Sequence, residues 1–203
     1  MHNYCEMSEF AFVRANIYRF LSMVYLREPT REVLDQLRAP EFLTAISELG
    51  GEFGEDFTET PPEKLLEDLA VEYARLFLGP GKHLSPHESV YVGPCGKEAE
   101  RGDLRSAGLG RVGLLWGDAT VQVVDQIEEF GFGLLPDYNG LPDHIGVELE
   151  LMHRLARSEG QAWEDGLEGQ AIDFLKKQLH FLQEHLTRWV PTFCDKVEAF
   201  AVH

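Results

Sequence analysis

The chain has 203 residues, of which 44% are hydrophobic and 26% are charged, so it can bury a core and is too apolar to be disordered. Its 18 Lys and Arg against 35 Asp and Glu give a formal net charge of −17, which repels phosphate backbones and argues against a nucleic-acid partner. Three cysteines without a paired spacing, and apolar runs shorter than the ~20 residues that cross a bilayer, predict a cytoplasmic protein without stable membrane insertion.

In chain order, apolar residues first recur at spacings of three and four within residues 8–27, which predicts a helix capped at Ser8. The predicted core stripe of this helix consists of Phe10, Val13, Ile17, Leu21 and Val24. Thr30 is predicted to cap a short helix that Pro40 ends. A third helix is predicted from Phe42 to the Gly50-Gly51 pair.

The middle of the chain alternates between helical and irregular patterns. Residues 51–60 are acidic and are predicted to form a surface loop. Thr60-Pro61-Pro62-Glu63 has the spacing of a capping box, so we expect a helix that runs from there to Gly79-Pro80-Gly81. Residues 82–117 are rich in Gly and Pro and are predicted to be irregular, apart from one helical turn near residues 98–104.

Helical spacing resumes in the second half of the chain. One helix is predicted between Gly117 and Gly131, and another over residues 145–155, followed by a loop over residues 158–169. A long amphipathic helix is expected over residues 172–189, and Pro191 is expected to start a last short helix.

No stretch alternates with a period of two, and no repeat of fixed length occurs. The pattern therefore predicts an all-α protein, a single-domain bundle of about eight or more helices over residues 1–203.

A metal site is poorly supported by the sequence. Di-iron carboxylate bundles need a Glu-x-x-His motif from each of two helices, and Glu150 with His153 supplies a single one. His180 and His185 are five residues apart, which does not place them on one helix face. We therefore predict no metal, although a metal-dependent helical-bundle enzyme stays an alternative.

Nucleotide and catalytic motifs are also incomplete. Residues 108–113 spell GxGxxG, but the preceding residues do not look like the strand that this motif requires. Gly81-Lys82 resembles the end of a P-loop without its other residues. Asp143-His144 could orient an acid–base pair, yet Asp is also common where a helix begins. We predict no catalytic residue, no cofactor and no enzymatic activity.

Binding of a peptide agrees better with these residues. Aromatic side chains and carboxylates are interleaved in or beside the loops, and such surfaces suit peptides with apolar and arginine side chains. The residues concerned are Glu72, Tyr73, Phe77, Glu88, Tyr91, Trp116 and Asp143. Tyr73 and Phe77 are equally consistent with core positions on their helix.

Four motifs in a fixed order resemble the TorD/DmsD/NarJ family of redox-enzyme maturation chaperones. They are E-Y-x-x-L-F-x-G-P (72–80), P-x-E-S-V-Y (86–91), G-D-A-T (117–120) and P-D-H-I-x-x-E-L-x-x-M (142–152). Two departures stand out: His87 occupies a position where the family often has an aromatic residue, and the Gly-rich segment 93–115 has no counterpart in the family pattern.

The resemblance implies an all-α chaperone that is not an enzyme and is a monomer or a domain-swapped homodimer, with a candidate swap hinge in the loop of residues 131–142. It implies binding of the N-terminal, often twin-arginine, signal peptide and of the apo-subunit of a molybdopterin-containing oxidoreductase of the DMSO reductase type. Such a chaperone assists cofactor insertion and prevents premature export. A scaffold or regulatory protein without an export client is the other alternative. By motif position, the implied peptide-binding residues are Tyr73, Glu88, Ser89, Tyr91, Trp116, Asp143 and His144.

Overall fold

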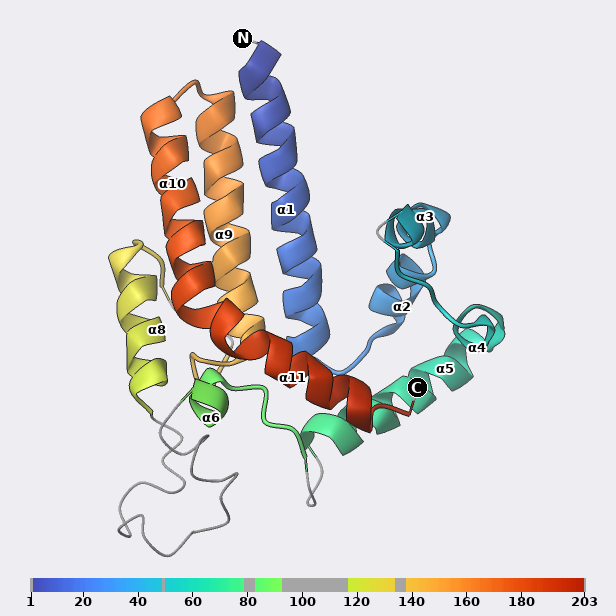
Figure 1. Cartoon of the computed structure of the whole chain (residues 1–203). Helices are drawn as coiled ribbons and strands as arrows, with labels where there is room; N and C mark the ends of the chain where they lie inside the picture. Colours follow the sequence, from blue (N-terminus) through green and yellow to red (C-terminus); the bar gives the residue numbers. More distant parts are fainter. Residues whose placement is uncertain (1, 49, 79–82, 93–116, 134–137, 203) are drawn as a thin grey trace, which may run out of the picture. The chain divides into compact units, whose positions relative to one another are not determined.

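The computed structural model describes residues 2–48, 50–78, 83–92, 117–133 and 138–202 (Figure 1). Throughout these ranges the regular elements are helices, and a single isolated bridge between His87 and His144 is the sole β-type pairing, which confirms the all-α prediction. The chain divides into two compact units. The first comprises residues 1–26 and 85–196, and the second comprises residues 27–84 and 197–203. A single domain over the whole chain stays a prediction.

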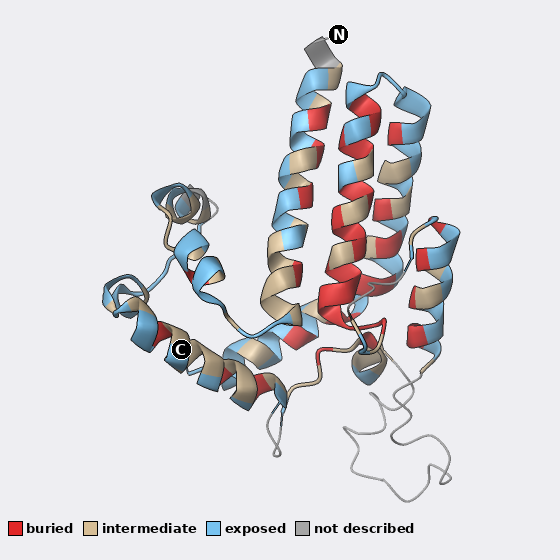
Figure 2. Ribbon diagram, turned by 180° about the vertical axis from the view of Figure 1, so that it is seen from behind, coloured by how far each residue is buried: buried red, intermediate tan, exposed pale blue. Residues whose placement is uncertain are grey.

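The first unit is built on three long helices that lie side by side, with α8 (Asp118–Glu129) alongside them (Figure 1). They are α1 (His2–Leu26), α9 (Ile145–Glu164) and α10 (Glu168–Phe181). Helix α9 lies between α1 and α10, and Figure 2 shows that buried residues run along its whole length. One core cluster joins α9 to α8, α10 and the turn that follows α10. Its α9 residues are Val147, Leu151, Met152 and Leu155, and its other members are Val123, Ile127, Phe130, Phe181 and Leu186.

Helix α1 meets α9 through small side chains, and its predicted core stripe is wrong at three of five positions, while Leu21 and Val24 are half-buried. Its fully buried residues are Ser8, Ala11, Ala15 and Ser22. The predicted core residues Phe10, Val13 and Ile17 are instead 70%, 56% and 48% exposed. The helix also begins at His2, so Ser8 is an interior residue and not a cap. Both faces of α1 are apolar, so a spacing of three and four cannot decide which one is buried.

The small residues of α1 allow a close approach to α9. Ser22 Oγ donates to the carbonyl of Gly146 at 2.7 Å, and His153 Nδ1 donates to the carbonyl of Ala15 at 2.8 Å. The ring of Phe12 occupies the space that a Cβ at Gly160 would need. Gly160 lies within α9, which continues to Glu164, so the loop predicted over residues 158–169 is wrong for its first part.

A buried carboxylate joins the three long helices. Glu159 of α9 accepts hydrogen bonds from Arg14 of α1, from Trp163 Nε1 at 3.2 Å and from Gln178 Nε2 of α10 at 2.8 Å. Because each oxygen of this buried group has a donor, its burial carries no unpaired charge.

Beyond α10 the helix continues through a π-helical turn, η2 (Leu182–Leu186), into α11 (Thr187–Phe200). Pro191 lies inside α11 and does not start a helix as predicted. Trp189 and Phe193 of α11 are fully buried. The short helix α6 (Glu88–Val92) also belongs to this unit and was not predicted.

The second unit contains α2 to α5 and a π-helical turn, η1 (Ala74–Leu78). Their bounds are α2 (Arg31–Leu37), α3 (Pro40–Glu48), α4 (Glu55–Glu59) and α5 (Pro62–Tyr73). Thr30 caps α2 as predicted, because its Oγ1 accepts from Val33 N at 3.4 Å. Two predictions are wrong: the acidic stretch contains α4, and Pro61 rather than Thr60 precedes α5. Pro62 suits the first helical position because it has no N–H and its φ is fixed near the helical value, while Pro61 offers no side-chain acceptor.

Side chains of η1 and α5 hold the last described residues through hydrogen bonds to their main-chain atoms. Arg75 donates to Glu72 at 2.8 and 2.6 Å, and its Nη2 also donates to the carbonyl of Phe200 at 2.5 Å. Glu72 Oε1 accepts from Val202 N at 2.7 Å. We refer to Glu72, Arg75 and the main chain of Phe200 and Val202 as the C-terminal clasp.

Candidate functional site

Two of the sequence motifs meet where α6 and α9 begin. Ile145 N donates to the carbonyl of Pro86, and Glu88 N donates to the carbonyl of Asp143, both at 2.9 Å. These bonds flank the antiparallel bridge between His87 and His144. The structure therefore brings together the segments 86–91 and 142–152, which are far apart in the sequence.

Asp143 and His144 each organise a helix start. Asp143 Oδ2 accepts from Ser89 N at 3.0 Å, so its carboxylate caps α6 rather than its own helix. His144 is the N-cap of α9, because its Nδ1 accepts from Gly146 N at 3.0 Å. Asp143 has no exposed surface and His144 has little. Their polar atoms satisfy backbone donors that would otherwise be buried without partners.

Beneath this junction lies a pair of buried carboxyl groups, Glu88 and Glu148, both without exposed surface. His185 Nδ1 donates to Glu88 Oε2 at 2.6 Å, and Trp189 Nε1 donates to Glu148 Oε2 at 3.2 Å. Burial raises the pKa of Glu148 well above its ordinary value, and the charges of Glu88 and Asp143 raise it further against the opposing Trp189 hydrogen bond. The acid form of Glu148 can therefore donate its proton to Glu88.

Two histidines complete the junction. The rings of His87 and His144 meet edge to face with centroids 5.0 Å apart, and Ser85 Oγ lies 3.0 Å from His87 Nδ1. Burial, and next the neighbouring His87, lower the pKa of His144 to about 3. Burial also lowers the pKa of His87, against the opposing charge of Asp143. Neutral His144 is the form that its capping bond requires, because a protonated Nδ1 cannot accept.

Five of the predicted peptide-binding residues are near one another in the first unit. They are Glu88, Ser89, Tyr91, Asp143 and His144. Ser89 and Tyr91 are half-buried, and the Tyr91 ring stacks on Trp189 with centroids 5.4 Å apart. Burial, and next Cys194, raise the pKa of Tyr91 to about 12. Glu88 and Asp143 have no surface to offer and instead hold the helix that carries Ser89 and Tyr91.

For the other two predicted residues, the structure shows no place in this group. Tyr73 belongs to the second unit, where its ring meets Phe77 edge to face at 5.1 Å. Trp116 lies outside the described residues. Sequence reasoning missed Glu148, His185 and Trp189 as site residues. A signal existed for Glu148, because it is a carboxylate on the apolar stripe of a predicted helix, three residues after Ile145.

The motifs for other chemistries find no support in the part of the chain that the structure describes. There, no group of three or more His, Cys, Asp or Glu side chains is placed to hold a metal ion. Glu150 pairs with Arg154 at 3.1 Å, and His153 bonds to a main-chain carbonyl. Residues 108–113, Gly81-Lys82, the helical turn expected near 98–104 and the middle of the candidate swap hinge lie outside the described residues.

None of the helices in the described ranges combines the length and the apolar character that a membrane span requires.

The chain is similar to several known proteins. A family model described as nitrate reductase delta subunit matches residues 27–195. The chain is 28% identical to the chaperone protein TorD of Photobacterium profundum over 96% of this chain and 86% of that protein. It is 26% identical to the chaperone protein TorD of Aliivibrio salmonicida over 98% and 89%. A crystal structure of a proposed redox enzyme maturation protein from Archaeoglobus fulgidus covers 84% of this chain and 93% of its own, with 18% identity and a TM-score of 0.43.

Proposed function

Because the chain belongs to the nitrate reductase delta subunit family, we propose that it is a chaperone for a molybdopterin-containing oxidoreductase of the DMSO reductase type. In this proposal it binds the N-terminal, twin-arginine signal peptide and the apo-subunit in the cytoplasm. It thereby assists cofactor insertion and prevents premature export. Family membership confirms the predicted TorD/DmsD/NarJ relationship, and since its relatives are named chaperones, the protein is not an enzyme.

The observation that carries the proposal is similarity along the whole chain to proteins named TorD, which is not confined to one motif. The net charge of −17 supports the choice of ligand, because it attracts a peptide that bears arginines.

The junction of α6 and α9 suggests how the peptide is held. Val90 of α6 is 45% exposed, and its neighbours Ser89 and Tyr91 are half-buried. We propose that these three residues contact the peptide and that buried Glu88 and Asp143 fix their position. Tyr73 and Trp116 remain predicted peptide contacts. The same binding assay can test them.

The test is a titration of a labelled signal peptide from a candidate oxidoreductase against the full chain. We expect Asp143→Ala to weaken binding by about tenfold, because Ser89 N loses a charge-assisted acceptor. Asp143→Asn is the matched control, since its amide oxygen can still cap α6. We expect this variant to keep most of the affinity.

Two outcomes would contradict these statements. Equal affinity of Asp143→Ala and the native chain would remove the junction from the binding site. Failure of the native chain to bind any such signal peptide or apo-subunit would remove the proposed function itself.

A further inference from the structure

Helix α6 is too short to hold its own shape. It has five residues, and isolated helices shorter than about 12 residues are marginal in water. Its start is fixed by Asp143, which accepts from Ser89 N, and by the adjacent bridge between His87 and His144. The position of its outward residues therefore depends on the side chains that pack against the rest of α6.

Two side chains from η2 and α11 hold α6 at its two ends. His185 Nδ1 donates to Oε2 of Glu88, the first residue of α6, at 2.6 Å. Near the other end of α6, the ring of Tyr91 stacks on Trp189 with centroids 5.4 Å apart. Both His185 and Trp189 are buried, so neither can contact a bound peptide directly. Any effect of these two residues on peptide binding must pass through α6.

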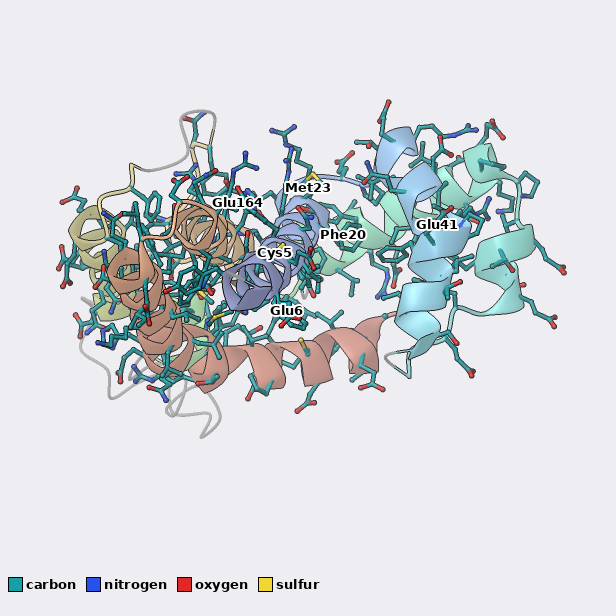
Figure 3. All side chains as sticks on the ribbon, turned by 90° about the horizontal axis from the view of Figure 1, so that it is seen from above. Cys5, Glu6, Phe20, Met23, Glu41 and Glu164 are labelled. Carbon is teal, nitrogen blue, oxygen red and sulfur yellow. The ribbon has the colours of Figure 1, made fainter. Side chains whose placement is uncertain are left out.

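The turn η2 gives His185 two separate contacts. A π-helical turn interrupts the α-helical register, and such turns are frequent at functional sites. The helix then continues as α11, and Figure 3, which looks along the three long helices, shows α11 turning away from the axis of α10. In this turn the ring of His185 stacks on Phe181 with centroids 4.6 Å apart, while Nδ1 is directed at Glu88. One contact is packing and the other is a hydrogen bond.

The hydrogen bond is the contact that matters for α6. Glu88 has no exposed surface, and besides His185 the acid form of Glu148 can donate to it. Loss of the His185 donor would leave a buried carboxylate short of a partner, which costs more than loss of a neutral contact. The chain can relieve this cost by moving Glu88 toward solvent, and α6 would move with it.

We propose that His185 is a positioning residue of the peptide-binding site, which acts through Glu88 to fix the outward residues of α6. This role rests on the proposed function, since it concerns how the same site is held. The hydrogen bond from Nδ1, and not the bulk of the ring, keeps α6 in the position that binds the peptide. His185 lies outside the four motifs that carry the family resemblance.

Two replacements of His185 in the full chain separate the hydrogen bond from the packing. His185→Phe keeps an aromatic ring against Phe181 and removes the donor. His185→Asn keeps a nitrogen donor near the place of Nδ1 and removes the ring. The probe is a labelled peptide of about 20 residues, with two adjacent arginines followed by an apolar run.

The two variants should differ in a definite order. We expect His185→Phe to weaken binding of the probe by about tenfold or more, because Glu88 loses a charge-assisted donor. We expect His185→Asn to stay within about threefold of the native affinity, because the donor is kept. A role in packing alone predicts the reverse order. Amide exchange in α6 gives an independent measure, and it should become faster in His185→Phe and stay close to native in His185→Asn.

A double-mutant cycle tests whether His185 acts through Glu88. In a Glu88→Gln background the buried group carries no charge, so loss of the donor costs less. We expect His185→Phe to weaken binding by less than about threefold in that background, against about tenfold or more in the native one.

His180→Phe is the matched control, because His180 is an exposed residue of α10 whose ring nitrogen lies near Gln126 of α8. It should change neither the peptide affinity nor the exchange of α6. Urea unfolding of each variant gives its folded fraction, so that affinities are compared between folded proteins. If His185→Phe does not fold, His185→Asn decides alone, because the hydrogen bond predicts near-native binding and packing predicts its loss.

Each contrary result has a distinct meaning. Native affinity of folded His185→Phe, or weak binding by folded His185→Asn, would overturn the positioning role and leave the proposed function intact. An equal effect of His185→Phe in both Glu88 backgrounds would show that the residue does not act through that carboxylate, which also overturns the proposal. If the native chain binds neither the probe nor authentic signal peptides, the proposed function falls, and the exchange of α6 then decides the positioning alone.

Discussion

At the scale of single residues, Glu148 shows how burial changes the chemistry of a carboxyl group. It has no exposed surface, it lies beside a second buried glutamate, and its pKa is raised well above the ordinary value. The acid form can bridge Trp189 and Glu88, since it offers one acceptor and one donor. The amide of glutamine offers the same pair of groups at nearly the same volume.

We therefore expect Glu148→Gln to preserve the fold and to flatten the dependence of stability on pH. The folded state keeps a proton that the unfolded chain loses above pH 4.5, so the native free energy of unfolding falls as pH rises from there toward the raised pKa. Urea unfolding at intervals from about pH 5 to about pH 8 measures this fall. Glu128→Gln, at an exposed position of α8, is the control. Identical pH profiles of Glu148→Gln and the native chain would contradict the assignment.

His144 titrates in the opposite sense. Its pKa is lowered from 6.5 to about 3, so the unfolded chain takes up a proton that the folded state refuses, and stability falls as pH falls below 6.5. Asparagine is also a good N-cap but does not titrate.

We expect His144→Asn to keep the cap of α9 and to lose less stability on acidification. The difference should reach about 2 kcal/mol between about pH 6.5 and about pH 5, since each pH unit is worth about 1.4 kcal/mol. Denaturant unfolding of both proteins at the two pH values tests this. His87 is present in both proteins, so its own titration largely cancels, and a variant as acid-sensitive as the native chain would disprove the role of His144.

Sequence patterns could identify part of this junction but not its interior. Asp143 and His144 stand out where an apolar-periodic stretch begins, and Glu88 stands out beside them. The partner of Glu88 is His185, which is 97 positions away, and no local spacing reports a contact of that kind. The burial of the junction residues could not be predicted for the same reason, because it depends on side chains from η2 and α11.

At the scale of helices, the close packing of α1 against α9 depends on Gly146. A Cβ at this position would lie 2.8 Å from Leu26 Cδ2 and 3.2 Å from the carbonyl oxygen of Ser22. We expect Gly146→Ala to lower the free energy of unfolding by about 1–3 kcal/mol through overpacking. Gly169→Ala on α10, where nothing lies within 4 Å, should cost nothing and can gain up to about 1 kcal/mol. Chemical denaturation of the two variants gives the comparison, and equal stabilities would contradict close packing at Gly146.

The C-terminal clasp provides a second prediction at this scale. Glu72→Ala removes the acceptor of Val202 N and the partner of Arg75, so the last residues of the chain should lose order while the rest keeps its structure. Hydrogen exchange of the C-terminal peptide should become faster. Arg31→Ala removes a surface ion pair of the same unit and should leave that exchange unchanged. Native exchange rates in Glu72→Ala would show that the clasp does not hold the chain end.

Helix periodicity located α8 between Gly117 and Gly131, whereas the helix predicted over residues 172–189 spans parts of α10, the turn η2 and α11. Two residues of its predicted apolar stripe, Ile172 and Leu179, are exposed. Periodicity also failed on the orientation of α1, whose two faces are both apolar, and on the end of α9, whose glycines resemble loop residues. The close approach of two helices requires small residues, and a hydrophobicity pattern does not distinguish such a face from a weakly apolar surface.

At the scale of the whole molecule, the net charge of −17 should control how fast a basic ligand arrives. We expect the association rate of an arginine-bearing signal peptide to fall by about tenfold or more between about 0.05 M and about 0.5 M salt, because the ions screen the field. The dissociation rate should change much less. Stopped-flow fluorescence separates the two rates. The same peptide with glutamine in place of arginine should show little salt dependence, and equal dependence for both peptides would contradict electrostatic steering.

The all-α class could be predicted at this scale because a missing period of two is visible throughout the sequence. The division into two units could not, because the first unit joins residues 1–26 to residues 85–196 across the second. Such a division depends on contacts between distant segments, which composition does not report.

The two sides of α1 also separate two kinds of evolutionary constraint. Ala11, Ala15 and Ser22 must stay small for α1 to pack closely against α9, so larger side chains at these positions lower the stability of the fold. Phe10, Val13 and Ile17 can vary at little cost to folding. Random replacement of the inward residues should therefore abolish folding far more often than the same replacement of the outward residues.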